Sequence, residues 1–151
     1  MSAILGIDVK KLTDTAKIPT YATDGSGAFD IYSDEKVYVG PDPHMIHTGI
    51  AVAIPKGWMM IIIPRSSIGA KTGLRMPHSA GLIDSDYRGE VKILYETKTG
   101  VPWEWLTGEY IQKGDRIAQG YLLPVVKADF MVVDELDETD RGEGGFGSTG
   151  A

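Results

Sequence analysis

The sequence predicts an all-β protein, built as a barrel or a sandwich of many short strands. Apolar runs rich in β-branched residues recur along the chain, and each run is bounded by glycine, proline or aspartate. Helical periodicity, with apolar residues three and four positions apart, is almost absent. The length of 151 residues fits one domain with a hydrophobic core of its own.

Four strands are predicted in the first half of the chain. Residues 4–12 open it with Ile, Leu and Val, and residues 28–32 (AFDIY) form a second, shorter run. Residues 45–54 and 58–64 are strongly apolar runs. The Pro-Lys-Gly sequence at 55–57 is typical of a tight turn, so we expect it to join these two strands.

The second half begins with the only helix-like segment, residues 66–73, which is long enough for about two turns. The strand pattern then returns at 89–97 and 115–126. A last predicted strand covers 130–136 (FMVVDEL).

Composition and charge exclude several classes of protein. The net charge is −6, whereas nucleic-acid and anionic-membrane binders usually carry a basic excess, so we expect neither partner. There is no cysteine, which excludes disulfides and thiolate metal sites. His44 and His47 would point to opposite faces of a strand, so we do not expect them to bind a zinc ion together. The apolar run at 58–63 is too short to span a membrane, and no signal peptide precedes it. We therefore expect a cytoplasmic protein.

Two segments differ in character from the rest of the chain. Residues 98–108 (KTGVPWEWLTG) hold two of the three tryptophans and are predicted to be a surface excursion, either folded back on the body or serving a partner protein. Six acids and one arginine occupy 134–143, and a glycine-rich end follows. Such a stretch buries too little apolar surface to offset its backbone entropy. We therefore divide the chain into a body at 1–137 and a flexible arm at 138–151.

Arginine placement suggests phosphate recognition. There are five arginines, none in the first 64 residues, and Arg65 precedes Ser66 and Ser67. A guanidinium fork suits phosphate oxygens, although five arginines are few and surface arginines are common. The tail formally matches G-x-G-x-x-G, but only four residues follow Gly147, so no helix could hold a pyrophosphate there. A flap whose Arg141 and hydroxyl groups close on phosphates is the better interpretation, and a plain disordered terminus is the alternative.

Residues 81–89 (GLIDSDYRG) could hold a general base. Two apolar residues lead into Asp84, and a carboxylate at the end of an apolar strand can be oriented and partly desolvated. The alternative is a plain hairpin whose acidic residues only satisfy backbone N–H groups of the turn.

Five segments in order make the chain resemble the trimeric deoxyuridine triphosphate nucleotidohydrolases (dUTPases). The resemblance covers nearly the whole chain, and its third and fifth segments are the most specific. The five segments are 27–31 (GAFDI), 64–69 (PRSSIG), 81–89 (GLIDSDYRG), 114–119 (GDRIAQ) and 141–150 (RGEGGFGSTG).

The resemblance implies a jelly-roll β-barrel, a homotrimer and hydrolysis of dUTP to dUMP and pyrophosphate with Mg²⁺. That reaction keeps uracil out of DNA and supplies dUMP for thymidylate synthesis. It implies that Asp84 activates a water for in-line attack on the α-phosphorus. Mg²⁺ would be held by the substrate phosphates and waters, with no direct protein ligand. Asp30 would hold one such water or brace the site, and Arg116 is expected to pair with a carboxylate.

The resemblance also assigns the substrate contacts. Phosphates would be bound by Arg65, Ser66, Ser67 and Gln119. The uracil would lie in the hairpin formed by Gly81, Leu82 and Ile83 and followed by Lys92. Tyr87 would pack on the deoxyribose, and His78 stands where some relatives have an Asn near the sugar or base. The arm would close over the substrate through Arg141, Phe146, Gly147, Ser148 and Thr149.

Two other functions stay open. A dCTP deaminase shares the fold and a similar Arg-Ser-Ser segment, but the 81–89 run and the glycine-rich arm argue for the hydrolase. A nucleotide-sensing or protein-binding module could use the same fold without turnover, with 98–108 as its contact.

Overall fold

The computed structural model describes residues 4–97 and 109–145. These residues form short strands and one short helix, so the all-β prediction is confirmed. No helix in the described ranges is long and apolar enough to cross a membrane. The strands are β1 (Asp8–Lys11), β2 (Thr20–Tyr21), β3 (Phe29–Tyr32), β4 (Val37–Val39), β5 (His44–Ala53), β6 (Trp58–Pro64), β7 (Leu74–Arg75), β8 (Gly81–Ile83), β9 (Glu90–Thr97), β10 (Glu109–Ile111) and β11 (Arg116–Pro124), and the helix is α1 (Ser66–Lys71).

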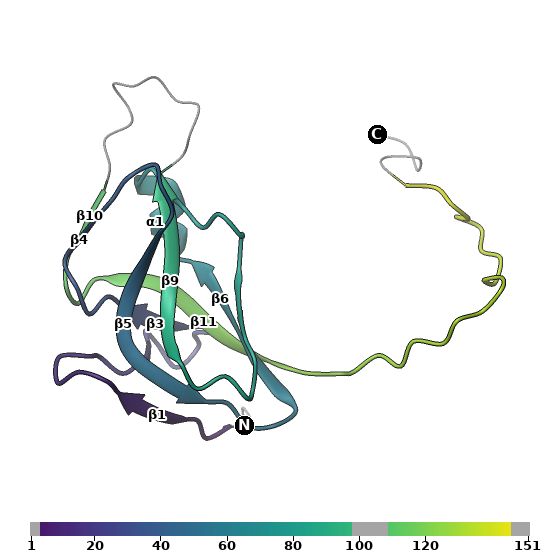
Figure 1. Ribbon diagram of the computed structural model, residues 1–151, viewed down its shortest axis with the longest axis horizontal. Helices are drawn as coiled ribbons and strands as arrows, with labels where there is room; N and C mark the ends of the chain where they lie inside the picture. Colours follow the sequence, from purple (N-terminus) through teal and green to yellow (C-terminus); the bar gives the residue numbers. More distant parts are fainter. Residues whose placement is uncertain (1–3, 98–108, 146–151) are drawn as a thin grey trace.

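Two antiparallel sheets form the body. One has the strand order β1-β5-β9-β7, the other has the order β2-β3-β11-β6-β8, and β10 pairs separately with β4. The chain crosses repeatedly from one sheet to the other, directly from β1 to β2 and at each step from β5 through β9. It also crosses from β3 to β5 by way of β4 and from β9 to β11 by way of β10. Figure 1 shows β5 and β9 passing in front of β3, β11 and β6. This is the predicted jelly-roll arrangement, with the two sheets open at their edges rather than closed into a barrel.

The hydrophobic core lies between the two sheets. Ile46 and Ile93 from one sheet and Ile31, Ile62 and Ile117 from the other are almost completely buried in a single cluster. Side chains of a strand point alternately to its two faces, so one face of each sheet supplies this core.

Tyr95 ties the sheets together through a polar contact inside the core. Its hydroxyl donates a hydrogen bond to the carbonyl of Ile117, at 2.8 Å. Burial raises the pKa of Tyr95 far above its usual value, although the positive charge of Arg65 acts in the opposite direction. The hydroxyl therefore stays protonated and can donate its hydrogen bond. The buried carbonyl of Ile117 needs such a donor.

Most of the predicted elements are confirmed. The strands predicted at 28–32, 45–54, 58–64, 89–97 and 115–126 correspond to β3, β5, β6, β9 and β11, and the predicted helix corresponds to α1. The strand predicted at 4–12 is shorter, since only Asp8–Lys11 pairs with β5. The remaining strands have two or three residues, too few to show a periodic pattern.

The strand predicted at 130–136 is wrong. These residues pair with no strand in the described chain, and Phe130 and Met131 are 90% and 81% exposed. The second sheet ends at Pro124, and Figure 1 shows residues 125–145 running away from both sheets. A strand needs a neighbour for its N–H and C=O groups, and this segment has none among residues 4–97 and 109–145. The predicted boundary between 137 and 138 stays a prediction.

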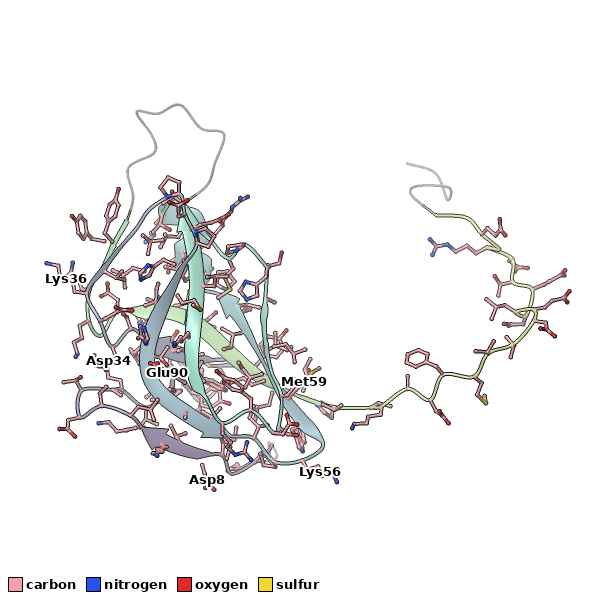
Figure 2. All side chains as sticks on the ribbon, in the orientation of Figure 1. Asp8, Asp34, Lys36, Lys56, Met59 and Glu90 are labelled. Atoms are coloured by element: carbon pink, nitrogen blue, oxygen red, sulfur yellow. The ribbon has the colours of Figure 1, made fainter. Side chains whose placement is uncertain are left out.

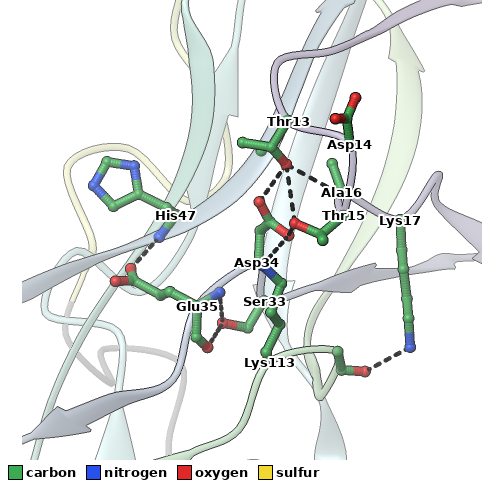
Figure 3. A network of polar contacts seen from close by, with 12 residues as sticks. Thr13, Asp14, Thr15, Ala16, Lys17, Ser33, Asp34, Glu35, His47 and Lys113 are labelled. Atoms are coloured by element: carbon green, nitrogen blue, oxygen red, sulfur yellow. Dashed lines mark hydrogen bonds and ion pairs between the residues drawn. The ribbon is translucent and has the colours of Figure 1, made fainter.

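A polar network fastens the N-terminal loop to the body (Figure 3). Thr13 and Thr15 donate hydrogen bonds to the two carboxylate oxygens of Asp34, and Lys113 forms an ion pair with it at 3.3 Å. Gly49, in the irregular part of β5, has a φ of +68°, and a Cβ there would lie 2.7 Å from the Asp34 carboxylate. Only glycine fits this position, because both its backbone angle and its surroundings exclude a side chain.

Candidate active site

The segment that joins β8 to β9 carries the predicted general base. β8 pairs only with β6, through Met60, Ile61 and Ile62, and forms the edge of its sheet. The turn after it is held by Arg88, whose Nη1 donates to the carbonyls of Ser85, at 2.7 Å, and Tyr87, at 2.9 Å. The loop therefore has a fixed backbone although it lies at an open edge.

A cavity of about 200 Å³ beside β8 brings five predicted residues together. We call it the hairpin cavity. The predicted members are His78, Gly81, Leu82, Ile83 and Lys92. Its other lining residues are the apolar Ile62, Met76, Ile93 and Leu94.

A tight turn presents His78 to this cavity. The amide of Ser79 donates to the carbonyl of Met76, and the amide of Ala80 donates to the carbonyl of His78. Ser79 has a φ of 63°, a backbone angle that non-glycine residues seldom adopt. A Cβ at position 81 would lie 3.6 Å from His78 Nε2, so glycine there keeps the space beside the imidazole open.

Asp84 lies at the end of β8 and lines a second cavity of about 890 Å³, which we call the turn cavity. Lys56, Arg88 and Lys127 line the same cavity. Figure 2 shows Lys56 and Met59 at the end of the body where the chain leaves β11. The carboxylates of Asp8 and Asp86 line it as well, so positive and negative side chains are equal in number there. The three cations can bind an anionic group next to a base.

The partial desolvation expected for Asp84 is absent in the single chain. Its side chain is exposed, because β8 is the last strand of its sheet and no further element of the described chain covers it. The described residues therefore do not supply the desolvation of this carboxylate.

Asp30 joins two arginines, Arg65 and Arg116, that come from two other segments of the family resemblance. Its side chain is only 5% exposed. Arg65 Nε donates to Oδ1 at 2.9 Å, and Arg116 Nη1 donates to Oδ2 at 3.3 Å. The expected pairing of Arg116 with a carboxylate is confirmed. Both carboxylate oxygens accept from a guanidinium, which supports the bracing role of Asp30 over that of holding a water.

These arginines line a third cavity of about 370 Å³, which we call the helix cavity. Ser67 and Lys71 of α1 and Tyr110 of β10 line it as well. Arg65 Nη1 donates to Ser67 Oγ at 3.3 Å, so the two predicted phosphate ligands lie together. No residue lines more than one of the hairpin, turn and helix cavities.

The other predicted residues lie at several places. Gln119 of β11 is half-buried in the sheet, opposite Asp30 on one side and Ile63 on the other. Ser66 is exposed at the start of α1. Arg141 lies on the segment that leaves the body, where its Nε donates to the carbonyl of Gly144 at 2.7 Å. Phe146, Gly147, Ser148, Thr149 and the segment 98–108 lie outside the described residues.

The family model for dUTPases matches residues 14–150. This chain belongs to the dUTPase family. The deoxyuridine 5'-triphosphate nucleotidohydrolase of Nautilia profundicola is 42% identical to it, over 95% of this chain and 98% of that protein. The enzyme of the same name from Legionella pneumophila is 44% identical, over 93% of this chain and 91% of that protein.

Solved dUTPase structures share its fold. The dUTPase of Staphylococcus bacteriophage 80alpha with dUpNHpp has a TM-score of 0.84 and 29% sequence identity, and the alignment covers 97% of this chain and 99% of that one. A mutant of the same phage enzyme, also with dUpNHpp, gives a TM-score of 0.84 and 28% identity. The jelly roll described above is thus the fold of this family.

The described residues do not form a metal cage. No group of three or more His, Asp or Glu side chains comes together within 4–97 and 109–145. Asp30, the one acidic residue predicted near the metal, is already paired with two arginines. The donor set therefore fits a Mg²⁺ bound through substrate phosphates and waters, which is how this ion is commonly held beside nucleotides.

Several residues of these cavities were not predicted from the sequence, among them three lysines and a tyrosine. Lys71 and Tyr110 line the helix cavity, and Lys56 and Lys127 line the turn cavity. Lys71 follows Ser67 by four positions on α1, so its helical spacing was a usable signal. The other three come from segments that only the fold brings near Arg65 or Asp84.

Proposed function

We propose that this dUTPase-family protein hydrolyses dUTP to dUMP and pyrophosphate, with Asp84 as the base. The observation that carries the proposal is the position of Asp84 at the end of β8. Asp84 directly follows three residues, Gly81, Leu82 and Ile83, that line a cavity of about 200 Å³. The chain matches the dUTPase family over residues 14–150.

The hairpin cavity would hold the uracil. β8 pairs with β6 along one side only, which leaves its other edge available to hydrogen-bond a pyrimidine through main-chain groups. Met76, Ile93 and Leu94 would contact the base, and close packing against them would disfavour a methyl group on it. His78 and Lys92 add side-chain donors, which suit the carbonyl oxygens of uracil.

Asp84 would take a proton from a bound water as that water attacks the α-phosphorus. The new bond forms between the water oxygen and the α-phosphorus, and the bond from that phosphorus to the bridging oxygen breaks. Pyrophosphate leaves with the electron pair, and dUMP keeps the new oxygen. Lys56, Arg88 and Lys127 would contact the negative charge that develops in this reaction, although Asp8 and Asp86 line the same cavity.

The phosphate chain would be bound by Arg65, Ser66, Ser67 and Gln119. Asp30 holds the guanidinium of Arg65 in one orientation, which favours recognition of phosphate oxygens. Mg²⁺ bound to the three phosphates would spread their negative charge.

A homotrimer would complete the site. The hairpin, turn and helix cavities share no residue, and the exposed apolar side chains of Val126, Phe130 and Val132 have no partner within the described chain. Exposed apolar surface of this kind is typical of a segment that packs on another protein. Arg141, Phe146, Gly147, Ser148 and Thr149 would close over the substrate bound by a neighbouring copy. A further protein partner at 98–108 and the cytoplasmic location remain predictions.

A product screen tests the function. The protein would be incubated in the presence of Mg²⁺ with one nucleotide at a time: dUTP, dCTP, dTTP or UTP. Pyrophosphate and ammonia would be measured in each reaction. We expect pyrophosphate from dUTP at least a hundredfold faster than from the other three, and no ammonia. Ammonia from dCTP would identify a deaminase instead. Tight dUTP binding without any product would identify a nucleotide-sensing module.

A further inference from the structure

Gly89 occupies a position where the backbone does not require glycine. The described glycines with a positive φ are Gly49, Gly57, Gly114 and Gly142, and Gly89 is not among them. An alanine at 89 would therefore meet no backbone strain.

The side chain of Tyr87 fills the space that a Cβ at position 89 would need. That atom would lie 2.5 Å from Tyr87 Oη, 2.7 Å from Cζ and 3.1 Å from Cε2. Distances this short are below van der Waals contact, so a side chain at 89 and the present ring position exclude each other. Gly89 lets the ring of Tyr87 fold back over the main chain.

The ring is held in this place by its own hydroxyl. Tyr87 Oη donates to the carbonyl of Glu90 at 2.9 Å. The backbone beneath the ring is fixed by the two hydrogen bonds from Arg88 to the carbonyls of Ser85 and Tyr87. Because Tyr87 is 43% exposed, its ring can swing outward more easily than the turn can move.

We propose that Gly89 is a positioning residue that sets the ring of Tyr87 against the sugar of the substrate and thereby excludes ribonucleotides. The inference rests on the proposed function and on the expectation, implied by the family resemblance, that Tyr87 packs on the deoxyribose. The hydroxyl of Tyr87 is already used by Glu90, so the ring, rather than the hydroxyl, blocks the space of a 2'-oxygen. A displaced ring opens that space.

The test compares two glycine-to-alanine variants in the full-length protein. Gly89→Ala adds the conflicting Cβ, whereas Gly25→Ala adds one with no atom within 4 Å. We expect Gly89→Ala to lower the ratio of kcat/KM for dUTP to that for UTP at least tenfold, and the affinity ratio of dUMP to UMP in calorimetry to fall with it. Gly25→Ala should change neither ratio by more than twofold. Unchanged ratios in Gly89→Ala would overturn the inference.

A double-variant cycle separates the ring from general damage to the turn. In a Tyr87→Ala background the ring is gone, so adding Gly89→Ala should change the dUTP to UTP ratio by less than twofold. If Gly89→Ala lowers the dUTP to UTP ratio equally with and without the Tyr87 ring, Gly89 acts on the turn itself and the inference is overturned. If Tyr87→Ala alone leaves the ratio unchanged while dUTP is still hydrolysed, the role of Tyr87 and this inference both fail and the proposed hydrolysis stands.

Discussion

Asp84 and Asp86 are two exposed carboxylates on one turn, and both line the turn cavity. Only Asp84 follows directly on β8, which also lines the hairpin cavity. The proposed reaction requires a base at this junction of the two cavities. The two residues therefore form a matched pair in which position alone differs.

Asp84→Asn should leave dUTP binding nearly intact and lower kcat about a thousandfold, the usual scale for loss of a general base. The amide keeps the shape of the side chain but cannot take the proton of the water. Steady-state kinetics and calorimetric binding of dUTP check this, with Asp86→Asn as the control, for which we expect a change of about threefold or less. A near-normal rate in Asp84→Asn would remove this residue as the base.

At the residue scale, the predicted site residues that the structure brings together are mostly ones that are close in sequence. His78 and residues 81–83 are close along the chain and line one cavity. The identity of the Arg116 partner could not be predicted, because Asp30 lies 86 positions away. The pairing depends on the register of β11 with β3, in which Gln119 stands opposite Asp30.

At the scale of elements, β5 shows how one strand is adapted to hold a loop. Its register with β9 shifts between His47 and Ala51, and Gly49 lies in that shift with its left-handed backbone. The irregularity makes room for Asp34, which binds the N-terminal loop through Thr13 and Thr15. Burial alone would raise the pKa of Asp34, but the hydrogen bonds from Thr13, Thr15 and Lys113 outweigh it and lower the pKa below its ordinary value.

The Asp34 network should make stability depend on pH. Because the pKa of Asp34 is lower in the folded state, its stabilisation is fully present above the ordinary value of 3.8 and is lost as the pH falls through the folded value. Asp34→Asn should lower the free energy of unfolding by about 1–3 kcal/mol at pH 7. The difference should shrink below about pH 4.

Urea unfolding between pH 7 and pH 2.5 measures this difference. Asp42→Asn is the control, because Asp42 is an exposed loop residue. We expect it to change stability by less than about 0.5 kcal/mol throughout. If the cost of Asp34→Asn stays constant down to the lowest pH, the carboxylate charge does not stabilise this network.

At the scale of the whole molecule, the chain leaves the body after β11 (Figure 1). Val125 still donates to the carbonyl of Gly57, and Lys127 lines the turn cavity. No residue of 125–145 belongs to the core cluster, so the core does not depend on this segment. The last part of the chain carries Arg141 and the glycine-rich end, to which we assign closure over the substrate. Folding and turnover are thus predicted to reside in different parts of the chain.

A chain that ends at Asp140 should keep its trimeric state and its melting temperature but lose most of its activity, with kcat/KM for dUTP lower at least a hundredfold. Sedimentation, thermal unfolding and kinetics check the three properties, and a chain lacking only Ala151 is the control. An unchanged rate would contradict the closing role of the arm. A truncated chain that is monomeric would show that residues 141–151 hold the assembly together.

The sequence by itself determined the fold class, the main strands and the types of residue in the site, because strand alternation, turn residues and ordered motifs are local properties of the chain. It could not show that 130–136 lacks a partner strand, since pairing depends on what lies alongside in space. Only the tertiary structure decided that Asp30 binds Arg65 and Arg116, that Asp84 is exposed, and that Tyr87 leaves no room for a side chain at Gly89. Each of these facts depends on strand register or on close packing. Register and packing set the distances between atoms that are far apart in the sequence, and the order of residues alone does not.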